Sequence, residues 1–270
     1  MKNYRDKNVL ITGGSSGIGF ALAEQMVLAE ANVWILARRE EILKDSLAQL
    51  EAKRIFENQK IGMIVADVSN FSTLKTQLNK VFSENTYPEI LFNCAGVVHP
   101  GEFLEMDIED YLSDISIDYM GTVNTTKIIA PLMAKNRRGH IVNISSLAGL
   151  VSIYGYSAYS PAKAAVKSFT AALRSELHPY NIQVSIVYPA DTETPQLTYD
   201  NEHKPALTKE ISEAWGLYTA EQTAQGIIKG MEKGKYAIMP SLTTRLLKPF
   251  AATVEVVMHR IALSKIRKAK

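Results

Sequence analysis

Short apolar runs rich in β-branched residues alternate along the chain with longer segments of helical periodicity. Each run is continuously apolar, which is typical of strands covered on both faces. Such alternation favours a parallel sheet joined by right-handed helical crossovers, with helices on both faces. The expected strands are 9–12, 32–37, 61–66, 90–93, 140–144, 183–187 and a short one near 236–239. The expected helices are 18–29, 40–57, 72–83, 107–134, 157–178 and 220–232.

The pattern therefore predicts an α/β fold, a doubly wound parallel sheet in one domain over residues 1–240, with a helical tail over 241–270. In such sheets, ligands bind beyond the carboxyl ends of the strands. With 270 residues and a 46% apolar composition, the chain is long enough to bury a substantial core.

A few residue types indicate whether the chain has disulfides or a metal site, and where in the cell it is found. Cys94 is the only cysteine, so no intramolecular disulfide is possible. The five histidines have no metal-ligand spacing, and we predict no metal site. The polar start MKNYRDKNVLIT has no export signal. We expect a cytoplasmic protein, with the cytosolic face of a membrane as an alternative place.

Charge is distributed unevenly along the chain. There are 30 Lys and Arg against 28 Asp and Glu, and residues 241–270 hold seven of the basic residues and a single acid, Glu255. The tail therefore carries +6 and the remaining chain −4. Because the main body is not basic, we do not expect nucleic acid as a partner.

The first expected strand ends in the glycine-rich sequence TGGSSGIG at positions 12–19. Glycines allow the sharp turn from strand to helix, and the free N–H groups at the helix start attract a pyrophosphate. An ordinary strand-to-helix loop is the alternative, but the context favours a dinucleotide. The predicted contacts here are Gly13, Ser15, Ser16, Gly17, Ile18 and Gly19.

The second expected strand ends in Arg38 and Arg39, where an NAD site usually has an acid for the ribose 2′-hydroxyl. An arginine would pair with the 2′-phosphate of NADP. We therefore predict NADPH as the cofactor. The alternative is that both arginines are merely solvated at a helix start.

The third and fourth expected strands end in small or polar residues that suit the rest of a nucleotide. Asp67 and Val68 follow the third strand and are placed to reach the adenine. Asn93, Ala95 and Gly96 belong to the turn NCAG after the fourth, where the backbone can lie along the ribose. Cys94 in the same turn is best interpreted as a small buried residue, because no nearby base would activate it.

Tyr159 and Lys163 lie four residues apart at the start of a helix and so share one face. A lysine ammonium near a phenol lowers the pKa of the tyrosine, which suits proton transfer. Ser146 follows the fifth strand, where its hydroxyl can point at a carbonyl oxygen. Tyr154 and Tyr156 have no lysine four residues on. Taken alone, a Tyr–Lys pair on a helix is usually structural.

Together these motifs resemble the short-chain dehydrogenase/reductases over nearly the whole chain: TGGSSGIG, NCAG, Ser146 and YSPAK (159–163), in that order. The resemblance implies a Rossmann-type fold in which Ser146 positions a carbonyl, Tyr159 exchanges its proton, and Lys163 holds the nicotinamide ribose and lowers the pKa of the tyrosine. It also implies a homo-oligomer, a dimer or tetramer. Pro189, Thr192 and Thr194 then fall where the family contacts the nicotinamide end, with Ala190 in place of the usual glycine.

Residues 178–205 resemble a narrower branch, the 3-ketodihydrosphingosine (3-dehydrosphinganine) reductases. The shared features are a Tyr-Pro…Asp-Thr-acid-Thr-Pro stretch and a Lys-Pro pair downstream. This implies NADPH-dependent reduction of the C3 ketone of a long-chain amino alcohol, in sphingolipid metabolism. A reductase of steroid, retinoid or fatty-acyl carbonyls is the alternative. A non-catalytic NADPH-binding sensor or scaffold is a third hypothesis, disfavoured by the complete Ser146, Tyr159 and Lys163 set.

The strand–helix rhythm lapses between about residues 190 and 218, so we expect a structureless loop that covers the substrate. Its apolar residues would grip an aliphatic chain, or they pack on the body whatever the substrate. They are Leu197, Tyr199, Leu207, Ile211, Trp215 and Leu217.

The tail shows helical spacing at Leu246, Phe250, Val254, Val257 and Ile261, followed by clustered basic residues. It is too short and polar to span a bilayer. A basic amphipathic helix lying on an anionic membrane would fit, and would suit a lipid-like substrate. A helix packing on its own domain or on a partner subunit is the alternative.

Asp118 lies in the apolar stretch ISIDYMGTVN, where the family usually has asparagine in an Asn-x-x-Gly pattern. In the family, the main-chain carbonyl of that asparagine holds a water that leads to the active-site lysine. The resemblance therefore implies a relay position for Asp118. A carboxylate near Lys163 would favour the charged lysine. It would alternatively face the ammonium of a sphingoid base.

Overall fold

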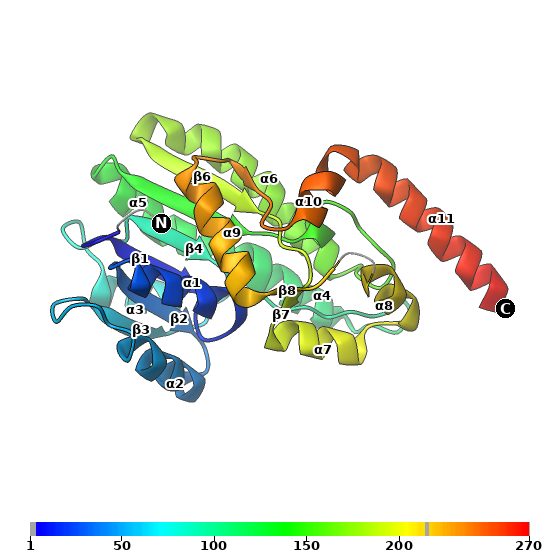
Figure 1. The fold of residues 1–270 in the computed structure, drawn as a ribbon, viewed down its shortest axis with the longest axis horizontal. Coiled ribbons are helices and arrows are strands. Elements are labelled where there is room, and N and C mark those ends of the chain that lie inside the picture. Colours follow the sequence, from blue (N-terminus) through cyan, green and yellow to red (C-terminus); the bar gives the residue numbers. More distant parts are fainter. Residues whose placement is uncertain (1–3, 214–215, 270) are drawn as a thin grey trace.

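A computed structural model describes residues 4–213 and 216–269 of the chain (Figure 1). Its centre is a seven-stranded parallel sheet with strand order β3-β2-β1-β4-β5-β6-β9. The order reverses direction after β1, so the crevice between β1 and β4 lies at the switch point where such sheets bind ligands. The strands are β1 (Asn8–Thr12), β2 (Asn32–Ala37), β3 (Ile61–Val65), β4 (Ile90–Asn93), β5 (Gly139–Ile144), β6 (Ile182–Val187) and β9 (Ala237–Ile238).

Helices cover both faces of this sheet, which makes the fold Rossmann-type as predicted (Figure 1). Along β1, Val9 and Ile11 pack with the helices of one face and Leu10 with those of the other. The continuous apolar runs therefore reflect two cores, one on each side. One face carries α1 (Gly17–Leu28), α2 (Glu40–Glu51) and α9 (Ala220–Glu232). The other carries α3 (Phe71–Val81), α5 (Gly121–Lys135) and α6 (Tyr159–Leu177), and α4 (Ile108–Asp114) packs beside α6.

Two expected helices differ from the structure. The helix predicted for 40–57 ends at Glu51, because buried Gln59 folds the following segment back. The Gln59 amide donates to the carbonyls of Val27 and Ala31, at 2.9 and 2.7 Å. The helix predicted for 107–134 is divided by a π-helical segment, Ile115–Met120, between α4 and α5.

The segment between β6 and α9 is not structureless, and that prediction was wrong. It contains β7 (Thr192–Glu193), α7 (Pro195–His203), α8 (Ala206–Glu213) and β8 (Tyr218–Thr219). Thr194 caps α7 by accepting a hydrogen bond from the Leu197 N–H, and Pro195 occupies the first helical position. These start signals outweigh the weak helical periodicity of the segment.

After β9 the chain forms α10 (Leu242–Leu247) and α11 (Ala251–Ala269), and α11 extends away from the sheet (Figure 1). The five tail residues predicted to form one apolar helix face lie in different environments. Val254 packs against the body, whereas Leu246, Phe250 and Val257 are exposed. Ile261 is half-buried. The body face is set instead by Ala251, Val254 and Met258.

No helix within the described residues is long and apolar enough to cross a bilayer.

Candidate active site

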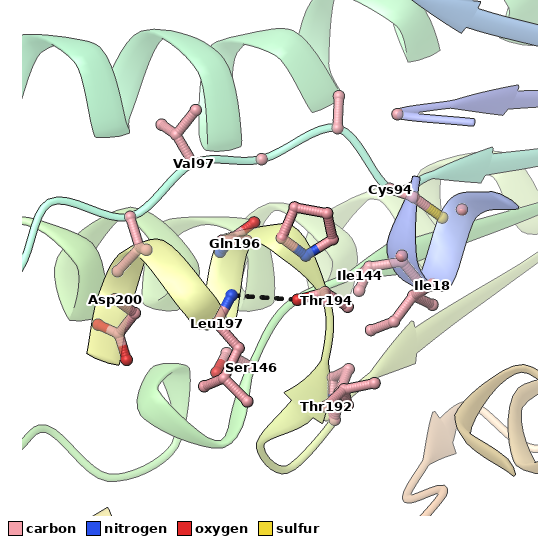
Figure 2. Close-up of a pocket in the computed structure, with 18 of the residues that line it drawn as sticks. Ile18, Cys94, Val97, Ile144, Ser146, Thr192, Thr194, Gln196, Leu197 and Asp200 are labelled. Carbon is pink, nitrogen blue, oxygen red and sulfur yellow. Dashed lines mark hydrogen bonds between the residues drawn. The ribbon is translucent and has the colours of Figure 1, made fainter. Parts of the chain in front are cut away.

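A cleft of about 580 Å³ opens beyond the carboxyl ends of the strands, between the sheet and α7 (Figure 2). Its walls come from the turn after β1, the end of β2, and the segments after β4, β5 and β6. Most of the residues predicted to form the site line it. They are Gly13, Ser15, Ser16, Gly17, Ile18, Gly19, Arg38, Arg39, Val68, Ala95, Gly96, Ser146, Tyr159, Lys163, Pro189, Thr192 and Thr194.

The glycine-rich turn at one end of the cleft fits a dinucleotide. Gly13 has a φ of 67°, and a side chain there would meet the Ala95 backbone nitrogen at 2.8 Å. The turn therefore needs glycine to approach the segment after β4. α1 begins at Gly17, so its free N–H groups face this end of the cleft. The cradle suits a pyrophosphate.

The two arginines after β2 lie at the rim of this end. Arg38 and Arg39 both line the cleft, and both are exposed enough to meet a phosphate from solvent. The Arg38 guanidinium lies 3.6 Å from the Asp67 carboxylate. Asp67 itself is outside the cleft lining, where it also accepts a hydrogen bond from the Ser69 N–H at 2.8 Å.

Asn93 also lies outside the cleft lining. It is buried, and its amide donates to the Asn143 oxygen at 2.8 Å and to the Thr126 hydroxyl at 3.1 Å. Its side chain therefore joins β4 to β5 and α5. Its neighbour Cys94 does line the cleft, and burial raises the pKa of its thiol well above the ordinary value. A thiol of that kind is not a nucleophile near neutral pH.

At the other end of the cleft, Ser146, Tyr159 and Lys163 come together as predicted. Tyr159 is the first residue of α6, and the Lys163 Nζ lies 5.6 Å from its ring centre. Ser146 follows β5 and accepts a hydrogen bond from the Ala148 N–H at 3.1 Å, which fixes its side chain. Hydrogen bonding with Ser146 and the charge of Lys163 both lower the pKa of Tyr159.

The net pKa of Tyr159 differs from the prediction. Burial raises it to about 12, and this effect exceeds the lowering by Lys163. The expectation of a lowered pKa was correct for the lysine alone and wrong for the sum, because burial disfavours the phenolate. Tyr159 is therefore a neutral phenol near pH 7, the form that donates a proton.

Asp118 forms a buried ion pair with Lys163, at 3.3 Å between Oδ2 and Nζ. Its Oδ1 accepts a hydrogen bond from the Val97 N–H at 2.8 Å. A side chain at Gly96 would meet both members of the pair, at 2.9 and 3.1 Å. Burial lowers the pKa of Lys163, but Asp118 and Tyr159 raise it more, so the net pKa is above the ordinary value. The carboxylate thus keeps the lysine charged.

A second buried carboxylate next to this pair was missed. Asp114 is fully buried one turn before Asp118, and its Oδ1 lies 2.6 Å from the His99 Nδ1. Burial, opposed by the hydrogen bond from His99, raises the pKa of Asp114 to about 6. The four-residue spacing of the two acids was the available signal. We call Asp114, Asp118, Lys163 and His99 the inner acid cluster.

A further group, between the body and α7, was also missed. Tyr156 donates to the Asp200 Oδ2 at 2.8 Å, and the Lys204 Nζ donates to the same oxygen at 3.0 Å. Lys204 also reaches the Ser212 hydroxyl on α8, at 3.0 Å. The i,i+4 spacing of Asp200 and Lys204 was the available signal. We call Tyr156, Asp191, Asp200 and Lys204 the lid acid cluster; all but Lys204 line the cleft.

The apolar residues predicted to cover the substrate have different positions. Leu197 and Tyr199, both on α7, line the cleft (Figure 2 labels Leu197). Ile211 and Leu207 pack into the apolar cluster under α8 instead. Leu217 is exposed. Trp215 lies outside the described residues.

Comparison with known proteins agrees with this geometry. Residues 7–205 match the family described as short chain dehydrogenase. A 3-dehydrosphinganine reductase of Danio rerio is 34% identical over 85% of this chain and 69% of its own length. A 3-ketodihydrosphingosine reductase of Dictyostelium discoideum is 34% identical over 90% of this chain and 77% of its own length.

Solved structures resemble the chain in fold. A short-chain dehydrogenase from Sphingobium yanoikuyae in complex with NADPH has a TM-score of 0.78 and 24% identity, covering 93% of this chain and 95% of its own. One from Burkholderia phymatum in complex with NAD has a TM-score of 0.80 and 23% identity, covering 98% and 97%.

Proposed function

The chain belongs to the short-chain dehydrogenase family and is an oxidoreductase, and we propose that it uses NADPH to reduce 3-ketodihydrosphingosine to dihydrosphingosine. The relatives from Danio rerio and Dictyostelium discoideum bear the names of that activity. The observation that carries the proposal is the convergence of Ser146, Tyr159 and Lys163 at one end of a cleft whose other end is the glycine-rich turn.

Each of the three side chains has a role in ketone reduction. The Ser146 hydroxyl donates a hydrogen bond to the substrate carbonyl oxygen, and Tyr159 gives that oxygen its phenolic proton. Lys163, held charged by Asp118, stabilises the phenolate that Tyr159 becomes. NADPH, when bound, supplies the hydride to the carbonyl carbon.

The cofactor would lie along the cleft with its pyrophosphate at the start of α1. Arg38 and Arg39 at the rim favour the 2′-phosphate of NADPH over the free hydroxyl of NADH. Lys163 holds the nicotinamide ribose, and Asp118 holds Lys163. The remaining contacts we propose are Gly13, Ser15, Ser16, Gly17, Ile18, Gly19, Asp67, Val68, Asn93, Ala95, Gly96, Tyr159, Pro189, Thr192 and Thr194.

The test is NADPH oxidation with purified protein and a panel of ketones: 3-ketodihydrosphingosine, a ketosteroid, a retinal and a fatty-acyl ketone. We expect the sphingoid ketone to be reduced fastest. The rate of its reduction should fall at least about 100-fold in Tyr159→Phe, because general acid catalysis contributes that much. Tyr154→Phe, outside the cleft lining, is the matched control. Preference for the steroid or retinal would assign the alternative substrate class. NADPH binding without turnover of any ketone would assign a sensor or scaffold.

We also propose peripheral contact of the tail with the cytosolic face of a membrane. Leu246, Phe250 and Val257 are exposed on a segment that also carries Arg245 and Lys248. Exposed apolar and basic side chains together suit an anionic lipid surface. Flotation with anionic liposomes should be lost in Leu246→Asp/Phe250→Asp, and equal flotation of variant and wild type would overturn this.

The protein is further proposed to be a homodimer or homotetramer through α4, α5 and α6. Ile108, Leu112 and Met120 are large apolar side chains left exposed in this part of the chain. Burying them between copies would remove apolar surface from water. Light scattering of purified protein measures the mass, and a monomer at micromolar concentration would contradict the proposal.

A further inference from the structure

Asp200 is a buried acid whose two carboxylate oxygens differ. Its side chain lies in the cleft wall on α7, on the same side as Leu197 (Figure 2), and the residue is 4% exposed. Oδ2 accepts hydrogen bonds from both Tyr156 and Lys204. Oδ1 is equally buried but has no hydrogen-bond donor among the described residues. A buried carboxylate oxygen without a donor is costly, so a donor from a ligand would be stabilising.

The charges around Asp200 also do not balance. Asp191 follows β6 and lines the same cleft, and its carboxylate receives no hydrogen bond or ion pair from the residues the structure describes. Burial raises the pKa of Asp191 to about 6, while Lys204 lowers it. Near neutral pH the lid acid cluster therefore has two carboxylates against one ammonium. Its net negative charge faces the cleft and would be neutralised by a cation there.

The cluster lies beside the reacting group. The Tyr156 and Tyr159 rings are 5.6 Å apart in edge contact, and the charge of Asp200 acts on Tyr159. The substrate proposed above has its amino group on the carbon next to the ketone. When Tyr159 contacts the carbonyl oxygen, that ammonium must lie within a few ångströms of the same place, within reach of an acid in this wall.

We propose that Asp200, through Oδ1, binds the ammonium group of the substrate, with Asp191 as the second carboxylate and Tyr156 and Lys204 as the residues that position Asp200. This rests on the proposed function and names the recognition of its substrate class, a long-chain 2-amino ketone. Asp118 does not serve this role, because it lies outside the cleft lining and its free oxygen, Oδ2, faces the Lys163 ammonium at 3.3 Å.

The first test uses wild-type protein and two substrates. One is 3-ketodihydrosphingosine, and the other is the same long-chain hydroxyketone with hydrogen in place of the amino group. We expect kcat/KM to be at least about 10-fold higher for the amino ketone, because a charge-assisted hydrogen bond is lost with the other. Reduction of neither ketone would refute the proposed function itself. Equal reduction of both would leave that function standing and overturn only the ammonium site.

The second test uses Asp200→Asn, which keeps the shape and the acceptor oxygen but removes the charge. We expect kcat/KM for the amino ketone to fall about 10- to 100-fold, while that for the amine-free ketone stays within about threefold. Asp191→Asn should give the same pattern with a smaller loss. Glu202→Gln, an exposed acid on the same helix, is the matched control and should change neither value.

The substrate ratio separates recognition from a purely structural role. Asp200 also ties α7 to the body, so a structural defect would reduce both activities together. A parallel loss for both ketones, or no loss for either, would overturn the proposal. NADPH binding, followed by the change in its fluorescence, should match wild type in Asp200→Asn.

Discussion

The inner and the lid acid clusters both lie near Tyr159 and contain similar charged groups. Each has two carboxylates and one lysine, and in each the second carboxylate has a pKa raised by burial to about 6. They differ in what partners that second carboxylate. The His99 Nδ1 lies 2.6 Å from the Asp114 carboxylate, whereas the Asp191 carboxylate has no hydrogen bond or ion pair with any described residue.

A buried ion pair therefore does not by itself identify the role of a cluster. The inner cluster is complete, because every acid in it has a partner within the chain, and this suits a permanent support for Lys163. Each cluster has one buried carboxylate oxygen without a hydrogen-bond donor among the residues that the structure describes, Oδ2 of Asp118 and Oδ1 of Asp200. The Asp118 oxygen faces Lys163, whereas the Asp200 oxygen belongs to a cluster that opens on the cleft, which suits a ligand. Removing the lysine from each cluster in turn is therefore the most direct way to separate their roles.

Lys163→Met should have the largest effect. It removes the ammonium that stabilises the Tyr159 phenolate and leaves Asp118 buried without its counter-ion. We expect kcat to fall at least about 1,000-fold and the free energy of unfolding to fall by about 3 kcal/mol. Single-turnover kinetics and urea denaturation measure the two effects. Lys167→Met, exposed on the same helix, is the control, and a variant at position 163 with a tenth of wild-type kcat would contradict the assignment.

Lys204→Met should act on binding more than on chemistry. Lys204 joins Asp200 on α7 to Ser212 on α8, but it does not touch Tyr159 or Ser146. We expect KM for the sphingoid ketone to rise about 10-fold, with kcat within about threefold. The substitution would loosen the cleft wall around Asp200 but leave the proton donor Tyr159 in place. Lys209→Met on α8 is the exposed control. A fall in kcat like that of Lys163→Met would show that the two clusters share one role.

The glycine-rich turn and the Ser146, Tyr159 and Lys163 set were predictable because their sequence signals are local. The glycine-rich turn, Ser146 and the Tyr159–Lys163 pair each depend on a few adjacent residues and on a strand that ends beside them. The seven strands were predicted for the same reason, since each is a continuous apolar run.

The rest depends on contacts between distant residues. Tyr156 meets Asp200 across 44 positions, and His99 meets Asp114 across 15. Neither distance leaves a periodic signal in the sequence. The net pKa of Tyr159 was mispredicted because burial is a tertiary property, while the lysine beside it is a local one. α7 was missed because it is short and only weakly patterned, and α8 because it is only eight residues long.

Asp118→Asn should change the pH dependence more than the rate. Asp118 raises the pKa of both Lys163 and Tyr159. Reduction needs the charged lysine and the protonated tyrosine, so activity is lost as the pH rises through either pKa. Without the carboxylate both pKa values fall, and the alkaline limb of kcat/KM should move down by about one pH unit. Profiles from pH 7 to 12, with brief exposure to the alkaline buffers, measure this shift, and an unchanged limb would show that the charge of Asp118 is incidental.

His99→Ala should have the smallest effect. It leaves Asp114 without a side-chain partner among the described residues, as Asp191 is in the lid acid cluster. Asp114 would lose its one hydrogen bond from a ring nitrogen, at 2.6 Å, and remain buried. We expect activity within about threefold of wild type and a loss of about 1–2 kcal/mol in the free energy of unfolding at pH 7.5. His99→Gln, which can still donate to Asp114, should recover part of that stability.

The pH dependence of this stability loss has a definite sign. The folded-state pKa of Asp114, already raised to about 6, should rise further without His99, whose hydrogen bond and charge lower it. A raised acid pKa means that the folded state holds its proton more tightly than the unfolded chain, so stability falls as the pH rises through that interval. The deficit of His99→Ala should therefore be large at pH 7.5 and shrink towards pH 5, where Asp114 is protonated in both proteins. If urea denaturation gives a loss of unfolding free energy that is independent of pH, His99 contributes packing alone. The Asp114 carboxylate would then have no electrostatic partner in His99, and the contrast with Asp191 would fail.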